Sequence, residues 1–227
     1  MEKEIYILGI GRNTIVYIEL LELCGYTIKG LYHFDNSRTG EIYFGYPIIG
    51  SAEELYAKSQ LSGMSFALSM GDNKYRREAY EKIISKGGNI PTIVHPKADV
   101  SKYAKLGNGV VVHSNAVVHP DTLIGDNTVI SCNCSIIHTS KIGSHCYLAA
   151  GVIFGAFNEV QDTVFRGLGA IIVSGKEACI GDNVTIGAGA VVTASVEPNS
   201  VMAGVPAKLI RRQYCYECFS RYSLSCL

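Results

Sequence analysis

Aliphatic side chains recur at every sixth position along the second half of this chain. From residue 100 to residue 160 the spacing holds without a break. An α-helix repeats about every 3.6 residues and a strand every two, so neither element alone produces this period. A short fixed period predicts a solenoid, in which three six-residue segments form one triangular turn and the recurring side chain fills the interior. The predicted inward positions are Val100, Leu106, Val112, Val118, Ile124, Ile130, Ile136, Ile142, Leu148, Phe154 and Val160.

A second column of mostly small residues supports the same interpretation. It stands four positions after each inward residue, where the chain bends between segments, and includes Ala104, Val110, Ala116, Thr122, Thr128, Cys134, Ser140, Cys146 and Val152. Glycines that directly follow an aliphatic position ease the corners. We therefore predict a parallel β-helix over residues 99–206, with Cys134 and Cys146 as packing thiols.

The period fails at two places. Residues 172–180 are two residues longer than one repeat, so we predict an insertion within residues 173–179 before the repeat resumes at Ile180. Arg166 stands where an aliphatic residue should point inward. Because an unpaired guanidinium inside a narrow prism is expensive, we expect a local distortion or an outward-turned Arg166.

The first 94 residues alternate strand and helix signals. Short apolar runs predict strands over residues 4–8, 26–33, 66–70 and 92–94, and helices are predicted over residues 13–24, 51–58 and 74–85. Ser51 and Glu54 form a capping box for the second helix. This alternation indicates a small parallel sheet of Rossmann-like character.

Composition narrows the classes of function. Lys plus Arg and Asp plus Glu both number 20, so neither nucleic acid nor a membrane surface is an expected partner. The charged N-terminus lacks the apolar region of a signal peptide, and no apolar run reaches about 18 residues, so we expect a cytoplasmic protein with free thiols. Cys215 and Cys218, even with Cys226, lack a fourth ligand, so we expect no metal site there.

The hexads, the closing stretch over residues 180–192 and the exit over residues 204–208 resemble the hexapeptide-repeat acyltransferases. The first domain resembles a narrower group, the bacterial sugar acetyltransferases that act on nucleotide-linked amino sugars. The resemblance lies in residues 5–13, residues 71–73 and the strand that enters His95-Pro96. Sialic acid O-acetyltransferases are relatives of this group. The resemblance implies a homotrimer with acetyl-CoA in the groove between neighbouring subunits. It implies a Rossmann-like nucleotide-sugar-binding domain (residues 1–94), a left-handed β-helix acyltransferase domain (residues 95–212) and a C-terminal tail (residues 213–227).

His138 matches the position of the catalytic histidine in these enzymes. The resemblance implies that its imidazole acts as the general base, because a ring with a pKa near ~6.5 can accept a proton near neutral pH. The family commonly carries Asp or Glu directly after this histidine, whereas this chain has Thr139. A hydroxyl can hydrogen-bond but supplies no charge, so either another carboxylate replaces the acid, or the base is weaker, or the activity is lost or altered.

The resemblance also implies which residues contact CoA. Tyr147 stands where some relatives carry a second histidine, and its phenol either donates a hydrogen bond to the thioester or CoA, or lies along the coil as a surface aromatic. By the same alignment, backbone groups border the CoA channel at Gly143, Gly155, Leu168 and Ala188.

Substrate-binding candidates lie in the first domain. Gly9 and Gly11 permit a tight turn after the first strand, so that the amides of Arg12 and Asn13 approach a ligand at a helix N-terminus, which favours phosphate. The third glycine of a dinucleotide fingerprint is replaced by Thr14, which favours a nucleotide sugar over NAD. Further candidates are Asp35, Asn36, Gly71, Asp72 and Asn73. For Asp35 and Asp72, a role in a turn or as a helix cap is at least as open as contact with a ligand.

The other histidines have simpler interpretations. His113 and His119 each follow an inward position and are expected to decorate the coil surface. His95 marks the domain junction, and His145 lies near the proposed site but off the position seen in the family.

The leading hypothesis is an acetyl-CoA-dependent N-acetyltransferase that acts on a nucleotide-linked amino-deoxy sugar, most simply a 4-amino sugar, for surface glycan synthesis. An O-acetyltransferase of sialic acid or another sugar hydroxyl uses the same scaffold. A catalytically weakened binding or scaffold trimer is the alternative that Thr139 and Arg166 favour. A formyl donor would require a folate site, for which no motif is present. The nucleotide base and the sugar are left open.

Overall fold

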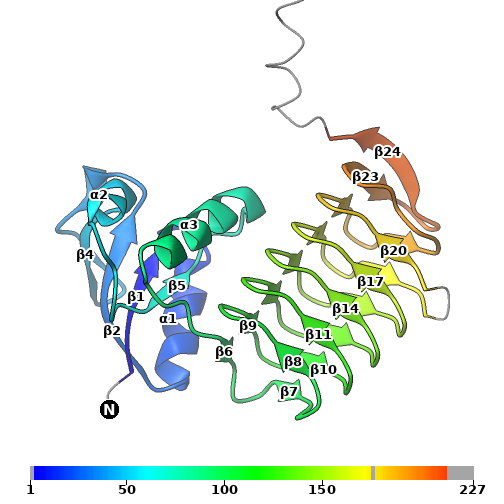
Figure 1. Ribbon diagram of the computed structural model, residues 1–227, viewed down its shortest axis with the longest axis horizontal. Coiled ribbons are helices and arrows are strands. Elements are labelled where there is room, and N and C mark those ends of the chain that lie inside the picture. Colours follow the sequence, from blue (N-terminus) through cyan, green and yellow to red (C-terminus); the bar gives the residue numbers. More distant parts are fainter. Residues whose placement is uncertain (1–2, 175–176, 214–227) are drawn as a thin grey trace, which may run out of the picture.

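The chain forms an α/β domain followed by a long triangular coil that lies beside it (Figure 1). The computed structural model describes residues 3–174 and 177–213. No helix within those residues is long and apolar enough to cross a membrane. The cysteines of the predicted tail lie outside the described residues.

A five-stranded sheet forms the centre of the first domain. Its strand order is β3-β4-β2-β1-β5, with β4, β2, β1 and β5 parallel and β3 antiparallel to β4. The strands are β1 (Lys3–Leu8), β2 (Tyr26–His33), β3 (Ile42–Tyr43), β4 (Tyr46–Ser51) and β5 (Phe66–Leu68). Helix α1 (Thr14–Leu23) packs on one face, and α2 (Ala52–Ala57) and α3 (Asn73–Ser85) pack on the other.

The Rossmann-like prediction is confirmed in outline, and two details are wrong. The β3–β4 hairpin was not predicted, because its turn uses Phe44 and Gly45 in place of the usual Asn-Gly pair, both with positive φ. The strand predicted over residues 92–94 is β6 (Ile93–Val94), and it pairs with the coil strand β9 instead of the domain sheet. The coil therefore begins before His95.

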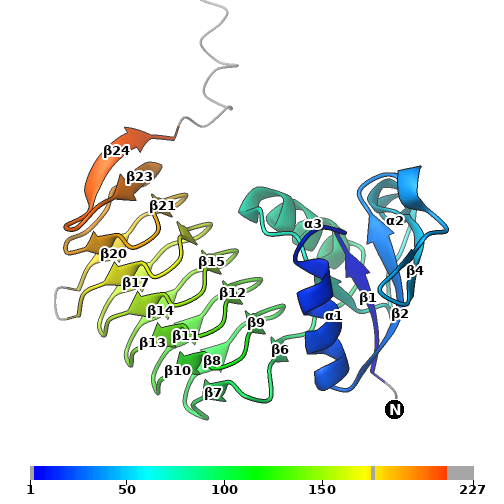
Figure 2. The ribbon, with the colours of Figure 1, turned by 180° about the vertical axis from the view of Figure 1, so that it is seen from behind.

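Two-residue strands repeat along three faces of the coil (Figures 1 and 2). The apolar face is formed by β7 (Asp99–Val100), β10 (Val117–Val118), β13 (Ser135–Ile136), β16 (Ile153–Phe154), β19 (Ile171–Ile172) and β22 (Val191–Val192). The charged face is formed by β8 (Lys105–Leu106), β11 (Leu123–Ile124), β14 (Lys141–Ile142), β17 (Glu159–Val160) and β20 (Cys179–Ile180). The docked face is formed by β6, β9 (Val111–Val112), β12 (Val129–Ile130), β15 (Tyr147–Leu148), β18 (Phe165–Arg166), β21 (Thr185–Ile186), β23 (Ser200–Ala203) and β24 (Lys208–Arg212).

This arrangement confirms the predicted left-handed parallel β-helix. Strands on each face pair in parallel, except that β24 is antiparallel to β23. The predicted inward residues from Val112 to Val160 are buried in one continuous core. Cys134 and Cys146 are buried in that core, as predicted. The two-residue insertion is also confirmed, because Glu159 pairs with Cys179, twenty residues on, whereas Lys141 pairs with Glu159, eighteen residues on.

The expectation for Arg166 is wrong. Its side chain points inward and is 0% exposed, and its strand keeps regular pairing with both neighbours. The guanidinium carbon lies 4.3 Å from the centre of the Phe154 ring. The face of the Phe154 ring accommodates the guanidinium, and the backbone keeps its regular pairing.

Helix α3 joins the two parts of the molecule. Arg76 Nη2 donates to the backbone oxygens of His145 and Cys146, both at 3.0 Å, and its Nε donates to Asn127 O at 3.4 Å. Tyr80 donates to Asp126 Oδ2 at 3.0 Å. These contacts fix the domain against the docked face of the coil.

Candidate active site

A cavity of about 770 Å³ opens at the carboxyl ends of β1, β2 and β5. Ligands of parallel α/β sheets bind at this edge. The turn after β1 and the turn before α3 form its floor, and side chains of α2 and α3 form its wall. We call it the domain pocket; it is lined by Gly9, Ile10, Gly11, Arg12, Asn13, Phe34, Ala52, Tyr56, Ser69, Met70, Gly71, Asp72, Tyr75, Glu78, Ala79 and Lys82.

Buried hydroxyl groups hold the first turn of this pocket. Thr14 Oγ1 accepts a hydrogen bond from Gly11 N at 2.8 Å, and Ser69 Oγ donates to Gly9 O at 2.5 Å. Gly9 has φ +94, and a Cβ there would lie 2.7 Å from Met70 Cε. Thr14 thus takes a structural role at the position of the missing third glycine.

Most predicted substrate residues line the domain pocket together. Six of them line it: Gly9, Gly11, Arg12, Asn13, Gly71 and Asp72. Asp72 also caps α3, because its Oδ1 accepts from the amides of Lys74 and Tyr75. Asn73 faces the coil instead: its Nδ2 donates to Thr163 O and its Oδ1 accepts from Arg76.

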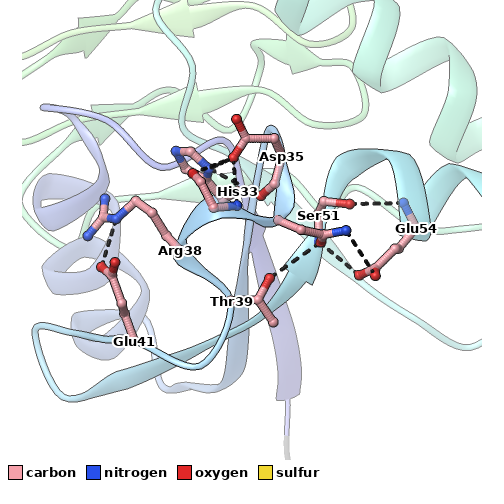
Figure 3. A network of polar contacts seen from close by, with 9 residues as sticks. His33, Asp35, Arg38, Thr39, Glu41, Ser51 and Glu54 are labelled. Atoms are coloured by element: carbon pink, nitrogen blue, oxygen red, sulfur yellow. Dashed lines mark hydrogen bonds and ion pairs between the residues drawn. The ribbon is translucent and has the colours of Figure 1, made fainter.

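Asp35 and Asn36 lie beside the pocket in a polar network (Figure 3). Asp35 Oδ1 accepts from both the side chain and the amide of Ser37, which lowers the pKa of its carboxyl, and it lies 3.0 Å from His33 Nδ1. Asn36 Nδ2 donates to Glu54 Oε1. Of this loop it is Phe34 that lines the cavity.

A second cavity of about 310 Å³ lies where α1 meets the coil. It follows the corners between the docked and apolar faces, and we call it the interdomain pocket. Asn13 lines both cavities, so the two are adjacent. Its other lining residues are Val16, Tyr17, His113, Ser114, Ser131, Cys132, Tyr147, Ala149, Ala150 and Leu168.

His138 is exposed on a different edge of the coil. It lies in the turn between β13 and β14, where the apolar and charged faces meet. Its Nδ1 is 3.2 Å from Thr139 Oγ1, and the Phe157 ring packs edge-on at 5.3 Å between centres. Thr139 has φ +56, a backbone conformation that it shares with the equivalent corner residues of neighbouring coil turns, such as Asn133 and His145.

The predicted CoA contacts are distributed over several corners. Tyr147 and Leu168 line the interdomain pocket, and Ala188 lies on the same edge of the coil between β21 and β22. Gly155 lies one coil turn after His138, on the same edge between the apolar and charged faces, and Gly143 lies on the third edge, between the charged and docked faces. A Cβ at either glycine would meet backbone of the next turn below 3.0 Å, so the coil itself requires both glycines.

Two histidines lie at the domain interface: His113, which was expected on the coil surface, and His145, which was expected near the proposed site. His113 packs edge-on against Tyr17 at 5.8 Å, and burial lowers its pKa to about 4. The surface interpretation of His113 is therefore wrong. His145 is buried, its Nδ1 lies 2.9 Å from Asn127 Nδ2, and burial lowers its pKa as well.

Sequence reasoning missed the pocket residues supplied by helices. Tyr75, Glu78 and Lys82 project from one face of α3 into the domain pocket, and their spacing of three and four residues was a readable signal. Tyr17 gave no such signal, because α1 is apolar almost throughout. Among residues 3–174 and 177–213 there is no group of three or more His, Cys, Asp or Glu that could hold a metal ion.

Two family models match this chain. Residues 4–83 match the PglD N-terminal domain, and residues 121–156 match the bacterial transferase hexapeptide family with six repeats. The first match covers the sheet and most of α3, and the second covers the turns that carry His138 and Tyr147.

Solved structures match over almost the whole chain. The acetyltransferase domain of PglB from Neisseria gonorrhoeae FA1090 is 25% identical with a TM-score of 0.83, and the match covers 92% of this chain and 100% of that one. A histidine-to-alanine mutant of GDP-perosamine N-acetyltransferase from Caulobacter crescentus, in complex with CoA and GDP-perosamine, is 27% identical with a TM-score of 0.75, covering 93% and 98%.

Curated relatives match over shorter stretches. GDP-perosamine N-acetyltransferase of Escherichia coli O157:H7 is 26% identical over 167 residues, which is 73% of this chain and 74% of that protein. The chain spans 30% of the length of a relative from Schizosaccharomyces pombe and 22% of the length of one from Escherichia coli K12.

Proposed function

We propose that this chain, which joins a match to the PglD N-terminal domain to bacterial transferase hexapeptide repeats, is an acetyltransferase. It transfers acetyl from acetyl-CoA to the amine of a nucleotide-linked amino sugar. A 4-amino sugar is the proposed acceptor class, with surface glycan synthesis as the setting. The similar enzyme from Caulobacter crescentus, which binds CoA and GDP-perosamine, supports this assignment.

The observation that carries the proposal is the pair of adjacent pockets. The domain pocket is large and lies at the phosphate-binding end of the sheet, next to the Arg12 and Asn13 amides. The interdomain pocket begins at Asn13 and ends on the coil at Tyr147 and Leu168. A nucleotide in the first pocket can therefore extend its sugar into the second, where small coil residues leave space for the arm of CoA.

A trimer completes this site. The apolar face presents Val117, Ile153 and Ile171 outward, with Ile153 44% exposed, whereas Lys105, Lys141 and Glu159 project from the charged face. We propose that three copies bury the apolar face around a threefold axis, as closed symmetry requires. Because His138 lies at one edge of that face and the interdomain pocket at the other, His138 of each copy then meets the pocket of its neighbour.

His138 acts there as the general base. The acceptor nitrogen attacks the thioester carbonyl, so a C–N bond forms, the C–S bond breaks and CoA leaves as a thiol. His138 takes the proton that the nitrogen loses and passes it to the leaving sulfur. The Tyr147 hydroxyl and backbone amides of the coil donate hydrogen bonds to the carbonyl oxygen. Thr139 orients the imidazole but adds no charge, so we expect a moderate base.

Release of CoA thiol tests this proposal. The purified protein is incubated with acetyl-CoA and GDP-, UDP- and dTDP-linked 4-amino sugars, and the product is identified by its mass. We expect turnover with at least one amino sugar, and a loss of about 100-fold or more in His138→Asn, a variant of similar size. Equal turnover by that variant excludes His138 as the base. Acetylation of sialic acid hydroxyls instead of amines would replace the N-acetyltransferase proposal by its O-acetyl alternative.

A further inference from the structure

The interdomain pocket differs from the domain pocket in its charge. Arg12, Asp72, Glu78 and Lys82 give the domain pocket charges of both signs. Among the described residues that line the interdomain pocket, none carries a carboxylate or an ammonium group. Its polar groups are the amide of Asn13, the hydroxyls of Tyr17, Ser114, Ser131 and Tyr147, the thiol of Cys132 and the imidazole of His113.

Two titratable groups that line this pocket, Tyr17 and His113, are held in their neutral forms by burial. Burial raises the pKa of Tyr17 and lowers that of His113, so both are uncharged near pH 7. Behind the pocket, the guanidinium of Arg76 lies 5.6 Å from the centre of the Tyr147 ring. Arg76 is 1% exposed and interacts electrostatically with Tyr17, so little solvent screens its charge from the pocket. Asp72, the carboxylate coupled to Arg76, lies on the domain-pocket side.

We infer that the interdomain pocket admits the acceptor as its uncharged amine and excludes the ammonium form. The inference rests on the proposed function. An ammonium group there would lose its hydration, gain no counterion from the lining residues of its own subunit and face the charge of Arg76. The free amine can instead exchange hydrogen bonds with neutral His113, whose ring nitrogens have no hydrogen-bond partner within the described residues.

In this arrangement the acceptor nitrogen loses its two protons at two different places. The first proton leaves the ammonium group to bulk water as the amine enters the pocket. The neutral nitrogen then attacks the thioester, and the second proton leaves it to His138 while the C–S bond breaks. A histidine without an acidic partner is sufficient for the second step, because the attached nitrogen is strongly acidic by then.

A carboxylate placed in the pocket tests the inference. Ser131→Asp adds a negative charge to the wall, and Ser131→Asn is the matched neutral control. The measurement is kcat and kcat/KM against pH for the amino sugar that turns over, with the pKa of its free amine measured by NMR. In the wild type and in Ser131→Asn, kcat should inflect at least about one pH unit below the free amine, while kcat/KM inflects near it. In Ser131→Asp, the inflection of kcat should rise by about one unit or more.

The facing corner of a neighbouring copy in the proposed trimer would add His119, Asp121 and His138, so Asp121→Asn is a second arm. It should leave the inflection of kcat in place. The inference is overturned if kcat of the wild type inflects at or above the free amine, if Ser131→Asp and Ser131→Asn share one profile, or if Asp121→Asn lowers the inflection. Absence of turnover with every amino sugar would instead refute the proposed function.

Discussion

Two buried arginines show how differently the domain interface and the coil interior treat charge. Arg76 at the interface donates to Asn73 Oδ1, His145 O, Cys146 O and Asn127 O, and Nη1 alone has no partner in the described part of the chain. In the coil interior, Nε and both Nη atoms of Arg166 have none there. Burial lowers the pKa of Arg166 to about 10, so it remains charged at neutral pH.

The comparison separates a charge that determines structure from one that the structure tolerates. Arg76 bridges two parts of the molecule through directional bonds, whereas Arg166 has the Phe154 ring as its main favourable contact. A buried polar group that is fully bonded fixes geometry, and one that is not bonded costs stability. Substitutions at the two sites should therefore change stability in opposite directions.

Arg76→Met should give the largest effect. It leaves the oxygens of His145 and Asn127 without their Arg76 donor, and Cys146 O with the Val129 amide alone, so we expect a loss of about 4 kcal/mol in the free energy of unfolding. Urea denaturation followed by circular dichroism measures it. Arg76→Lys keeps the charge but not the fork of donors and should recover less than half of the loss. A loss below about 1 kcal/mol in Arg76→Met would show that the contacts to the coil are not needed.

His113 should make the interface sensitive to acid. Its pKa is about 4 in the folded protein against about 6.5 unfolded, so the unfolded chain takes up a proton first as the pH falls. Stability is unaffected above about pH 6.5 and should be lost between that pH and 4, by about 3 kcal/mol in total. His113→Gln should remove this part of the pH dependence, measured as the difference between the two proteins. Parallel pH curves for both would contradict the buried neutral state.

Arg166→Leu should stabilise the coil. Replacing an unpartnered buried ion by an apolar side chain of similar volume removes its desolvation cost, so we expect a gain of about 2 kcal/mol. Val160→Ala, at a neighbouring inward position, should instead lose about 2 kcal/mol and controls for repacking. A destabilised Arg166→Leu variant would mean that the guanidinium has a partner in solution, such as a trapped water or anion.

Tyr80→Phe should give the smallest effect. It removes the hydrogen bond to Asp126 across the interface and leaves the ring in place against His145. We expect a loss of about 1 kcal/mol, and loss of the raised phenol pKa, about 12, in a spectrophotometric titration. Loss of a phenol that titrates near ~10 instead would place the hydroxyl in water.

The coil could be predicted almost residue by residue, because its six-residue period is a local property of the sequence. The inward position of Arg166 could not be predicted, since it depends on the ring of Phe154, which lies two strands earlier on another face of the coil, and no local pattern reports such a fit. Within the first domain, the β3–β4 hairpin was hidden by an unusual turn pair.

The candidate site was predictable where it follows a turn of the chain. Gly9, Gly11 and Asp72 stand directly after strands, and they line the domain pocket. The interdomain pocket joins α1 to coil turns about 100 residues later, so its members Tyr17 and His113 were not recognised. Likewise, the meeting of His138 with that pocket depends on a neighbouring copy and stays a prediction.

Complementation between two inactive variants tests the shared site most directly. His138→Ala removes the base, and Leu168→Arg blocks the interdomain pocket at an exposed position. Co-expressed with different tags and purified as mixed trimers, they should regain about one third of the wild-type activity per trimer, because one of three interfaces then joins an intact His138 to an intact pocket. Mixed trimers with no more activity than either variant alone would contradict a site built between subunits.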